Sequence, residues 1–144
     1  MHDIEANKRV AMRLLEDVFN ARRLDLLPEV IAPDYVTHAL GGFPPEVEPG
    51  PEGMRKEYEA FYAAIPDVKA EVLSIVAEGD RVVVLDHFGG THQGELAGRP
   101  GTGKPISWMV YHQYRIADGK IAEDWVLVDA LALMRQVGAI GDQA

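Results

Sequence analysis

The hydrophobic periodicity of this chain changes once, at Pro66, and that change constrains the fold more than any other feature. Before Pro66, apolar residues recur every three or four positions, which is typical of amphipathic helices. After it, apolar and polar residues alternate over segments rich in Val, Ile, Tyr and Trp, which is typical of half-buried strands. The four segments are residues 68–78, 81–88, 105–116 and 121–128. This order predicts an α+β fold, with three N-terminal helices packed on the concave face of a curved, mostly antiparallel sheet.

Two helices are expected near the start of the chain. Residues 5–22 carry an apolar stripe at helical spacing, with charged residues between its members. A short second helix is expected over residues 25–31, because Asp25 can act as its N-cap and Pro28 is tolerated in a first turn. The segment DYVTH, which follows and ends at His38, is strand-like.

A Pro- and Gly-rich segment, residues 41–53, reads as a loop rather than a linker, because apolar patterning resumes directly after it. The third helix is expected to start at Met54 and to end at Pro66. A short last helix, residues 130–137, should end at Gly138.

The turns between the strands differ in length. EGD at 78–80 and ADG at 117–119 are short enough for antiparallel hairpins, whereas LAGRPGTGK at 96–104 is a longer Gly-rich turn. Its GTGK lacks the spacing of a phosphate-binding loop and precedes a strand instead of a helix, so nucleotide binding is not indicated.

Size and charge narrow the classes of partner. The 144 residues are 47% hydrophobic, which suits a single domain over residues 1–144 with one core. A net charge of -9 argues against nucleic acid and anionic membrane surfaces. The sequence has no membrane-length apolar run, no cysteine and no apolar signal-peptide core at its start. We therefore expect a cytoplasmic protein that binds neither membranes nor nucleic acid.

In the hairpin around ADG, acidic residues lie on both sides of Trp125, although this segment reads as a buried strand. A three-residue loop with Gly119 in the left-handed conformation would place His112 opposite Asp124. A two-residue loop would pair His112 with Trp125 instead. We favour the first register.

In that register His112 and Asp124 share one face of the sheet with Trp108 and Val126. Glu123 would then lie on the outer face beside Arg115, and Asp129 would cap the last helix. A carboxylate and an imidazole in an apolar pocket suit proton transfer at a carbon next to a carbonyl. A structural hydrogen bond between the two is the alternative reading.

Several segments together resemble the SnoaL-like polyketide cyclases of the nuclear transport factor 2-like superfamily. They are GGTHQGELAGRPGTGK, YHQYRIADGKIAEDW, W-x-x-x-D at Trp125 and Asp129, and LMRQVGAI, preceded by VFN, PDY, His38, PDV and EGD. The resemblance covers about residues 10–140. It implies a cone-shaped α+β barrel, usually dimeric, with an apolar pocket, and ring closure by aldol condensation with an aspartate as acid and base and no cofactor.

The resemblance also implies site positions. Matching H-x-x-R-I-x-D-G-K-I places the cyclases' histidine on His112 and their catalytic aspartate on Val126. Asp124 lies two residues earlier on the same face, so we take it as the substitute base. His38 resembles a residue at the rim of the pocket and is the third candidate catalytic residue. The remaining candidates would bind substrate: Trp108, Tyr35, Tyr58, Phe61, Phe19, Val126, Asp129 and His92.

No metal or cofactor is expected. His38, His92 and His112 are widely separated, no H-x-x-x-H pair occurs, and cysteine is absent. Ser74 and Ser107 lack the context of a nucleophile elbow.

The favoured function is therefore a cofactor-independent acid/base enzyme, a cyclase or isomerase, acting on a small apolar carbonyl compound. An epoxide hydrolase or hydratase on the same scaffold is one alternative, and it would need a second inward carboxylate and an arginine. A ligand-binding module without chemistry is the other.

Overall fold

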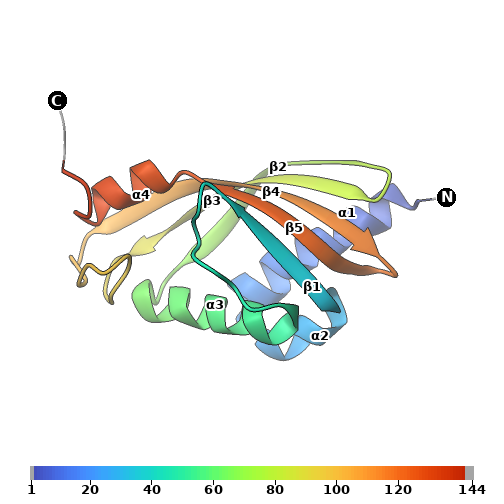
Figure 1. The fold of residues 1–144 in the computed structure, drawn as a ribbon, viewed down its shortest axis with the longest axis horizontal. Coiled ribbons are helices and arrows are strands. Elements are labelled where there is room, and N and C mark those ends of the chain that lie inside the picture. The colour runs from blue at the N-terminus through green and yellow to red at the C-terminus, as the bar shows by residue number, and fades with distance from the viewer. Residues whose placement is uncertain (1, 142–144) are drawn as a thin grey trace.

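A computed structural model of the protein describes residues 2–141. The chain forms one curved five-stranded sheet, with the helices of its N-terminal half gathered on one side of it (Figure 1). The elements in order are α1 (Ile4–Arg13), the π-helix η1 (Leu14–Asn20), the 3₁₀ turn η2 (Leu24–Leu26), α2 (Leu27–Val30), β1 (Ile31–Leu40), α3 (Gly50–Ala64), β2 (Lys69–Glu78), β3 (Arg81–Thr91), β4 (Pro105–Ala117), β5 (Lys120–Val128) and α4 (Ala130–Gln136).

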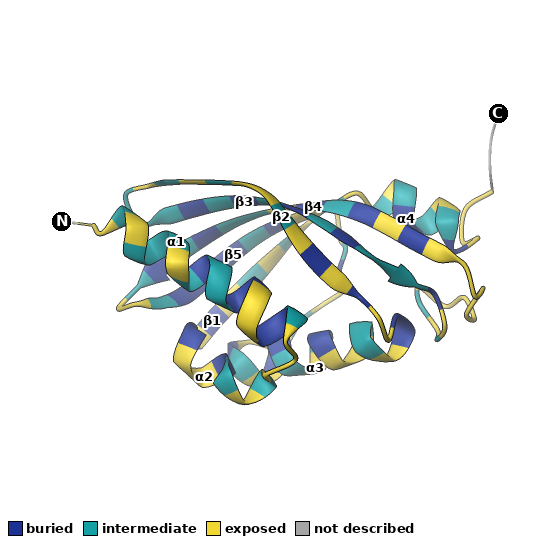
Figure 2. Cartoon of the chain, turned by 180° about the vertical axis from the view of Figure 1, so that it is seen from behind, coloured by how far each residue is buried: buried dark blue, intermediate teal, exposed yellow. Residues whose placement is uncertain are grey.

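The strand order is β1-β5-β4-β3-β2, and every neighbouring pair is antiparallel except β1 with β5. Helices α1, α2 and α3 lie against the same face, and the sheet bends over them (Figures 1 and 2). The core lies between these two layers and includes Phe19, Tyr35, Trp108 and Tyr114. The expected α+β class, with its curved and mostly antiparallel sheet, is confirmed. No helix within residues 2–141 is long and apolar enough to cross a membrane.

The first expected helix, residues 5–22, is present as α1 running directly into η1. The Asp3 side chain caps its start by accepting from the Ala6 N–H. Its end is attached to the sheet, because the Asn20 amide bonds both the N–H and the carbonyl of Ala70 at 2.8 Å. This attachment helps to fix the helical layer over β2.

The expected second helix needs two corrections. Asp25 is not an N-cap, because it lies inside the η2 turn and its carboxylate pairs with Arg23 at 2.9 Å. Ile31 does not end a helix either, since it begins β1. The strand-like DYVTH is thus part of a ten-residue strand, whose partner β5 is remote in sequence.

Helix α3 starts at Gly50, inside the segment expected to be a loop over 41–53. A proline at position 51 is compatible with a helix in its first turn. Gly53 allows the preceding loop to lie against the helix, because a Cβ there would be 1.7 Å from the Glu48 carbonyl oxygen. The loop is therefore held close to α3, where it forms one wall of a pocket.

The hairpin between β4 and β5 follows neither expected register. The turn has two residues, Asp118 and Gly119, both with positive φ, and Ala117 pairs with Lys120. An extra residue on β5, Ala122, then shifts the ladder by one position. This bulge returns the later side chains to the faces that the three-residue loop would have given.

Candidate active site

The inner face of the sheet carries a histidine between two carboxylates on neighbouring strands. His112 on the central strand β4 is opposite Val84 on β3 and Val126 on β5. Asp86 and Asp124 each lie two residues from those partners, and so stand diagonally to either side of the imidazole.

Both ring nitrogens of His112 face a carboxylate. Nδ1 lies 3.1 Å from Oδ2 of Asp124, and Nε2 lies 3.4 Å from Oδ2 of Asp86. The first contact meets hydrogen-bond geometry. The second does not, so within residues 2–141 neither oxygen of Asp86 has a hydrogen-bond partner. The shared face of His112 and Asp124 was predicted correctly, although the two are diagonal rather than opposite.

Burial and neighbouring charges shift the pKa of Asp86 and of His112. Asp86 is 0% exposed and Asp124 is 4% exposed. Burial raises the pKa of Asp86 to about 6; His112 acts against this rise, and the charge of Asp124 adds to it. Burial alone would lower the pKa of His112. The nearby carboxylates, Asp124 first and then Asp86 and Glu57, outweigh burial and raise the pKa of His112 above its ordinary value of 6.5.

Buried tyrosines surround the cluster. The ring of Tyr114 stacks on His112 with their centroids 5.0 Å apart. Burial, followed by the charge of Asp124, raises the pKa of Tyr35 and of Tyr114 well above its usual range. These phenols stay protonated near neutral pH, so the groups left to exchange protons there are the carboxyls and the imidazole.

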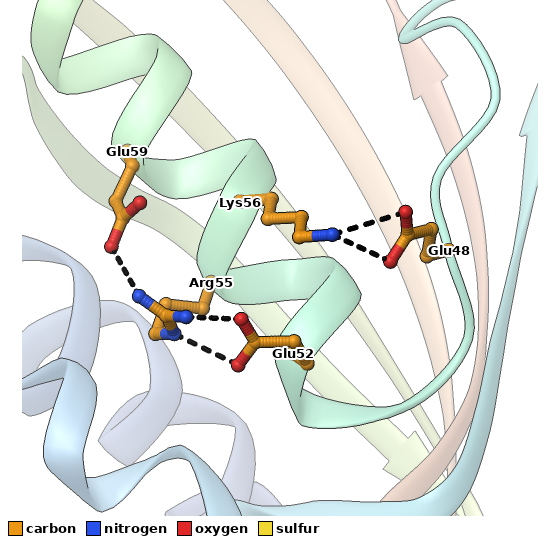
Figure 3. A network of polar contacts seen from close by, with 5 residues as sticks. All are labelled: Glu48, Glu52, Arg55, Lys56 and Glu59. Atoms are coloured by element: carbon orange, nitrogen blue, oxygen red, sulfur yellow. Dashed lines mark hydrogen bonds and ion pairs between the residues drawn. The ribbon is translucent and has the colours of Figure 1, made fainter.

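A pocket of about 420 Å³ opens between α3 and two loops. Such a volume suits a small organic ligand. Most of the lining is apolar, including Phe43, Val47, Phe61 and Leu96, and its rim carries glutamates. Figure 3 shows Lys56 reaching from α3 to the Glu48 carboxylate, at 3.0 and 3.1 Å. This ion pair joins the loop to the helix at the mouth.

Glu57 connects the pocket with the cluster. It projects from α3, lines the pocket, and is half-buried. Burial raises the pKa of Glu57 to about 7, the charge of Asp124 raises it further, and His112 acts in the opposite direction. Neither Asp124 nor His112 lines this pocket, so Glu57 is the member of the cluster nearest to a bound ligand.

The aromatic and apolar residues predicted to bind substrate fall into three pairs: one at the pocket, one in the core and one beside the His112 cluster. Phe61 lines the pocket and stacks on Trp108, with centroids 6.1 Å apart, so Trp108 supports the pocket wall from behind. Phe19 and Tyr58 pack edge to face at 4.8 Å within the core. Tyr35 and Val126 are buried beside the cluster, with Val126 opposite His112.

The position of His38 contradicts the expectation that it lines the site. Tyr35 points inward on β1, so alternation along the strand turns His38 to the outer face. There His38 lies 2.6 Å from Glu123 and stacks on Trp125. The predicted outer-face pair of Glu123 with Arg115 is present at 3.0 Å, and these two neighbours, His38 first, lower the pKa of Glu123.

Two further candidates also lie outside the cluster. His92 is fully buried, and its Nδ1 lies 3.2 Å from the Thr102 hydroxyl at the base of the Gly-rich loop. Asp129 is exposed and accepts a hydrogen bond from the Ala132 N–H, which confirms its predicted role as the cap of α4. Within residues 2–141, no set of three or more His, Cys, Asp or Glu residues is arranged to hold a metal ion.

The sequence reasoning missed Asp86 and Glu57. Glu57 had a readable signal, because it stands at helical spacing between Met54 and Phe61, where an apolar residue is expected. For Asp86, alternation with His87 showed only that one of them faces inward. The choice depends on the β3–β4 register, which the long intervening loop leaves open in the sequence.

Comparison with known proteins now decides the family. The profile of the family described as SnoaL-like polyketide cyclase matches residues 9–137. The chain belongs to the SnoaL-like polyketide cyclase family. Two curated members are each 30% identical to it over 130 residues. DauD from Streptomyces sp. (strain C5) and DnrD from Streptomyces peucetius are both aklanonic acid methyl ester cyclases; the match covers 88% of this chain, 79% of DauD and 88% of DnrD.

Solved structures agree with this assignment. TsrD from Streptomyces laurentii is 28% identical, with a TM-score of 0.85 over 97% of this chain and 100% of that one. IdmH from Streptomyces antibioticus is 33% identical, with a TM-score of 0.78 over 92% and 98%. In this SnoaL-like chain, Val126 occupies the position where the resemblance places an aspartate, and Asp124 supplies the carboxylate that contacts His112.

Proposed function

We propose that the protein is a cofactor-independent acid/base enzyme that closes a ring in a small, apolar, carbonyl-bearing substrate, with Asp124 as its base. A substrate that extends from the pocket past Glu57 would bring a carbon next to a carbonyl to Asp124, which would take its proton. The resulting enolate would attack a second carbonyl of the same molecule. His112 would hold the Asp124 carboxylate in place and balance its charge. The net reaction is an isomerisation, so it needs no second substrate.

One observation carries this proposal: His112 lies between two buried carboxylates, and Glu57, whose pKa the charges of Asp124 and His112 shift, lines an apolar pocket. A buried carboxylate with a fixed hydrogen-bond partner and little water around it is suited to act as a base. The aromatic and apolar lining suits a ring-forming carbon skeleton rather than a highly charged metabolite.

The curated relatives provide the first substrate to test. Because DauD and DnrD are aklanonic acid methyl ester cyclases, this ester should be incubated with the protein and followed by chromatography and mass spectrometry. Ring closure gives a product of unchanged mass with a new retention time. A substrate that binds without being converted would favour the ligand-binding module.

A second function is supported by Asp86. Opening an epoxide by water needs a second inward carboxylate, and Asp86 provides one on the same face as Asp124. A histidine lies between them, whereas such an enzyme was expected from the sequence to need an arginine. Running the reaction in heavy-oxygen water separates the two functions, because hydrolysis adds one labelled oxygen and ring closure adds none.

We also propose that two copies pair through the outer face of the sheet. Tyr111, Leu127 and Leu40 are between 47% and 51% exposed there, and they line a shallow apolar groove with Trp125 and Val83. Single apolar residues are ordinary on a surface, but a contiguous patch favours a partner. The absence of cysteine favours the cytoplasm as the proposed compartment.

A further inference from the structure

Two buried carboxylates flank His112, and a third carboxyl group, that of Glu57, lines the pocket. Asp86 and Asp124 are 0% and 4% exposed and do not belong to the pocket wall. Glu57 lines the pocket, and the charges of Asp124 and His112 shift its pKa. A ligand in the pocket therefore meets Glu57 first.

The geometry of α3 separates Glu57 from the other glutamates of the helix. Gly53, Glu57, Ala60 and Phe61 recur at helical spacing and all line the pocket. Glu52 and Glu59 instead point to Arg55 on the exposed side of α3, where Glu59 lies 2.7 Å from a guanidinium nitrogen (Figure 3). Within residues 2–141 Glu57 makes no ion pair and no side-chain hydrogen bond, so its carboxyl is available to a ligand.

Titratable groups surround Glu57 on several elements. Asp124 and His112 face it from the sheet, and the phenols of Tyr35 and Tyr58 lie nearby on β1 and α3. At the mouth stand Lys56, which is paired with Glu48, together with Glu46 and Glu95. Burial, followed by the charge of Asp124, raises the pKa of Glu57 to about 7, so that a large share of the molecules carry a protonated Glu57 at neutral pH.

We propose that Glu57 is a catalytic residue: it is the acid that protonates the carbonyl oxygen attacked during ring closure. This inference rests on the proposed function, because it assigns the second half of the same reaction. Asp124 takes the proton from carbon, the new carbon–carbon bond forms as the carbonyl π bond breaks, and the oxygen takes the proton of Glu57. Return of the proton from Asp124 to Glu57 restores the enzyme, so protons and electrons balance.

Two carboxyls with different environments suit these two roles. A base must be ionised at working pH, and Asp124 has the imidazole of His112 within hydrogen-bond distance to stabilise its charge. An acid must be protonated, and Glu57 has no such partner within residues 2–141 and stands in an apolar wall. The sequence contains the same hint, because Glu57 interrupts the apolar side of its helix.

The decisive experiment compares Glu57→Gln with Glu59→Gln, using aklanonic acid methyl ester as substrate. Glu57→Gln should lower kcat by about a hundredfold and change KM only a few-fold, because the acid acts mainly in the transition state. The activity of the parent should fall above pH 7 as Glu57 ionises, and the residual activity of Glu57→Gln should not show this fall. Glu59→Gln should match the parent, since Glu59 lies on the exposed side of the helix.

The outcomes separate this inference from the proposed function. If Asp124→Asn inactivates the protein but Glu57→Gln keeps full activity and the parent pH profile, Glu57 is not the acid and ring closure by Asp124 stands. If neither substitution affects turnover, both assignments are wrong.

A titration measures the same property without turnover. Carbon-13 NMR of labelled glutamate, assigned by its loss in Glu57→Gln, should show Glu57 titrating near pH 7 and shifting when the ester binds. A titration midpoint of Glu57 near the ordinary 4.5 that does not change when the ester binds would overturn the inference.

Discussion

His112 Nδ1 lies 3.1 Å from the carboxylate of Asp124, although the two residues are not paired in the β4–β5 ladder. The bulge at Ala122 makes them diagonal neighbours, a separation that long side chains can bridge. The contact therefore depends on side-chain direction along the strands. A substitution that keeps the shape of either side chain should preserve the fold while it changes the chemistry.

Asp86→Asn should stabilise the protein at alkaline pH. The pKa of Asp86 is raised from 3.8 to about 6 in the folded state, so the stability associated with its protonated form is present below about pH 4 and is lost as pH rises through 6. Asparagine does not ionise, so the variant does not lose this stability. The free energy of unfolding of the variant minus that of the parent should therefore be about 1 kcal/mol larger at pH 8 than at pH 5. Denaturant titrations at both pH values measure this difference, and equal differences would contradict the raised pKa.

The outer face should hold two copies together. Light scattering at micromolar concentration should give twice the 15.8 kDa mass of one chain. Tyr111→Glu should give monomers, because it places a charge in the middle of the apolar groove. Leu131→Glu on α4 is a matched control, since Leu131 is as exposed as Tyr111, at 51%. A parent protein that scatters as a monomer would refute the dimer.

Turnover should survive strong chelation. The proposed reaction uses carboxyl groups and an imidazole, and no group of residues within 2–141 is arranged as a metal site. Activity measured before and after prolonged treatment with EDTA should be equal. Loss of activity that added zinc restores would show that a metal takes part.

Much of this site followed from the sequence because strands alternate. Because successive side chains of a strand point to opposite faces, His112 and Asp124 were expected on one face and Glu123 and Arg115 on the other. The structure contains both pairs. The pairing itself was wrong, because the residues around Ala122 give no sign of a bulge. Tyr35 and His38 were both expected at the site, but residues three apart on one strand face opposite sides of the sheet, and the structure has Tyr35 buried inside and His38 on the outer face.

Other features depend on contacts between distant segments. β1 was read only as the strand-like DYVTH, since its pairing partners on β5 lie about 90 residues away and a parallel pair leaves no turn signal. Asp86 could not be assigned to a face without the register across the 92–104 loop. Glu57 was readable in principle, because an acid on the apolar side of an amphipathic helix is a local inconsistency that often marks function.

His112→Ala should reduce turnover less than loss of the Asp124 carboxylate does, because in this account the imidazole orients and balances the base without touching the carbon. The double variant should be hardly worse than Asp124→Asn alone, since the two residues act as one unit. Rates of the parent, both single variants and the double variant form the required cycle. Independent, additive losses would show that His112 has a separate role.

Whether Asp124 is the base is decided by the turnover of Asp124→Asn, measured together with that of Asp129→Asn. Asp124→Asn keeps the shape of the side chain and removes the base, so kcat should fall by about a hundredfold or more while the affinity for substrate stays within a few-fold. Asp129→Asn should keep full activity, because Asp129 caps α4 and asparagine is also a good cap. Full activity of Asp124→Asn together with an inactive Asp129→Asn would contradict the account and assign catalysis to the acid at the start of α4.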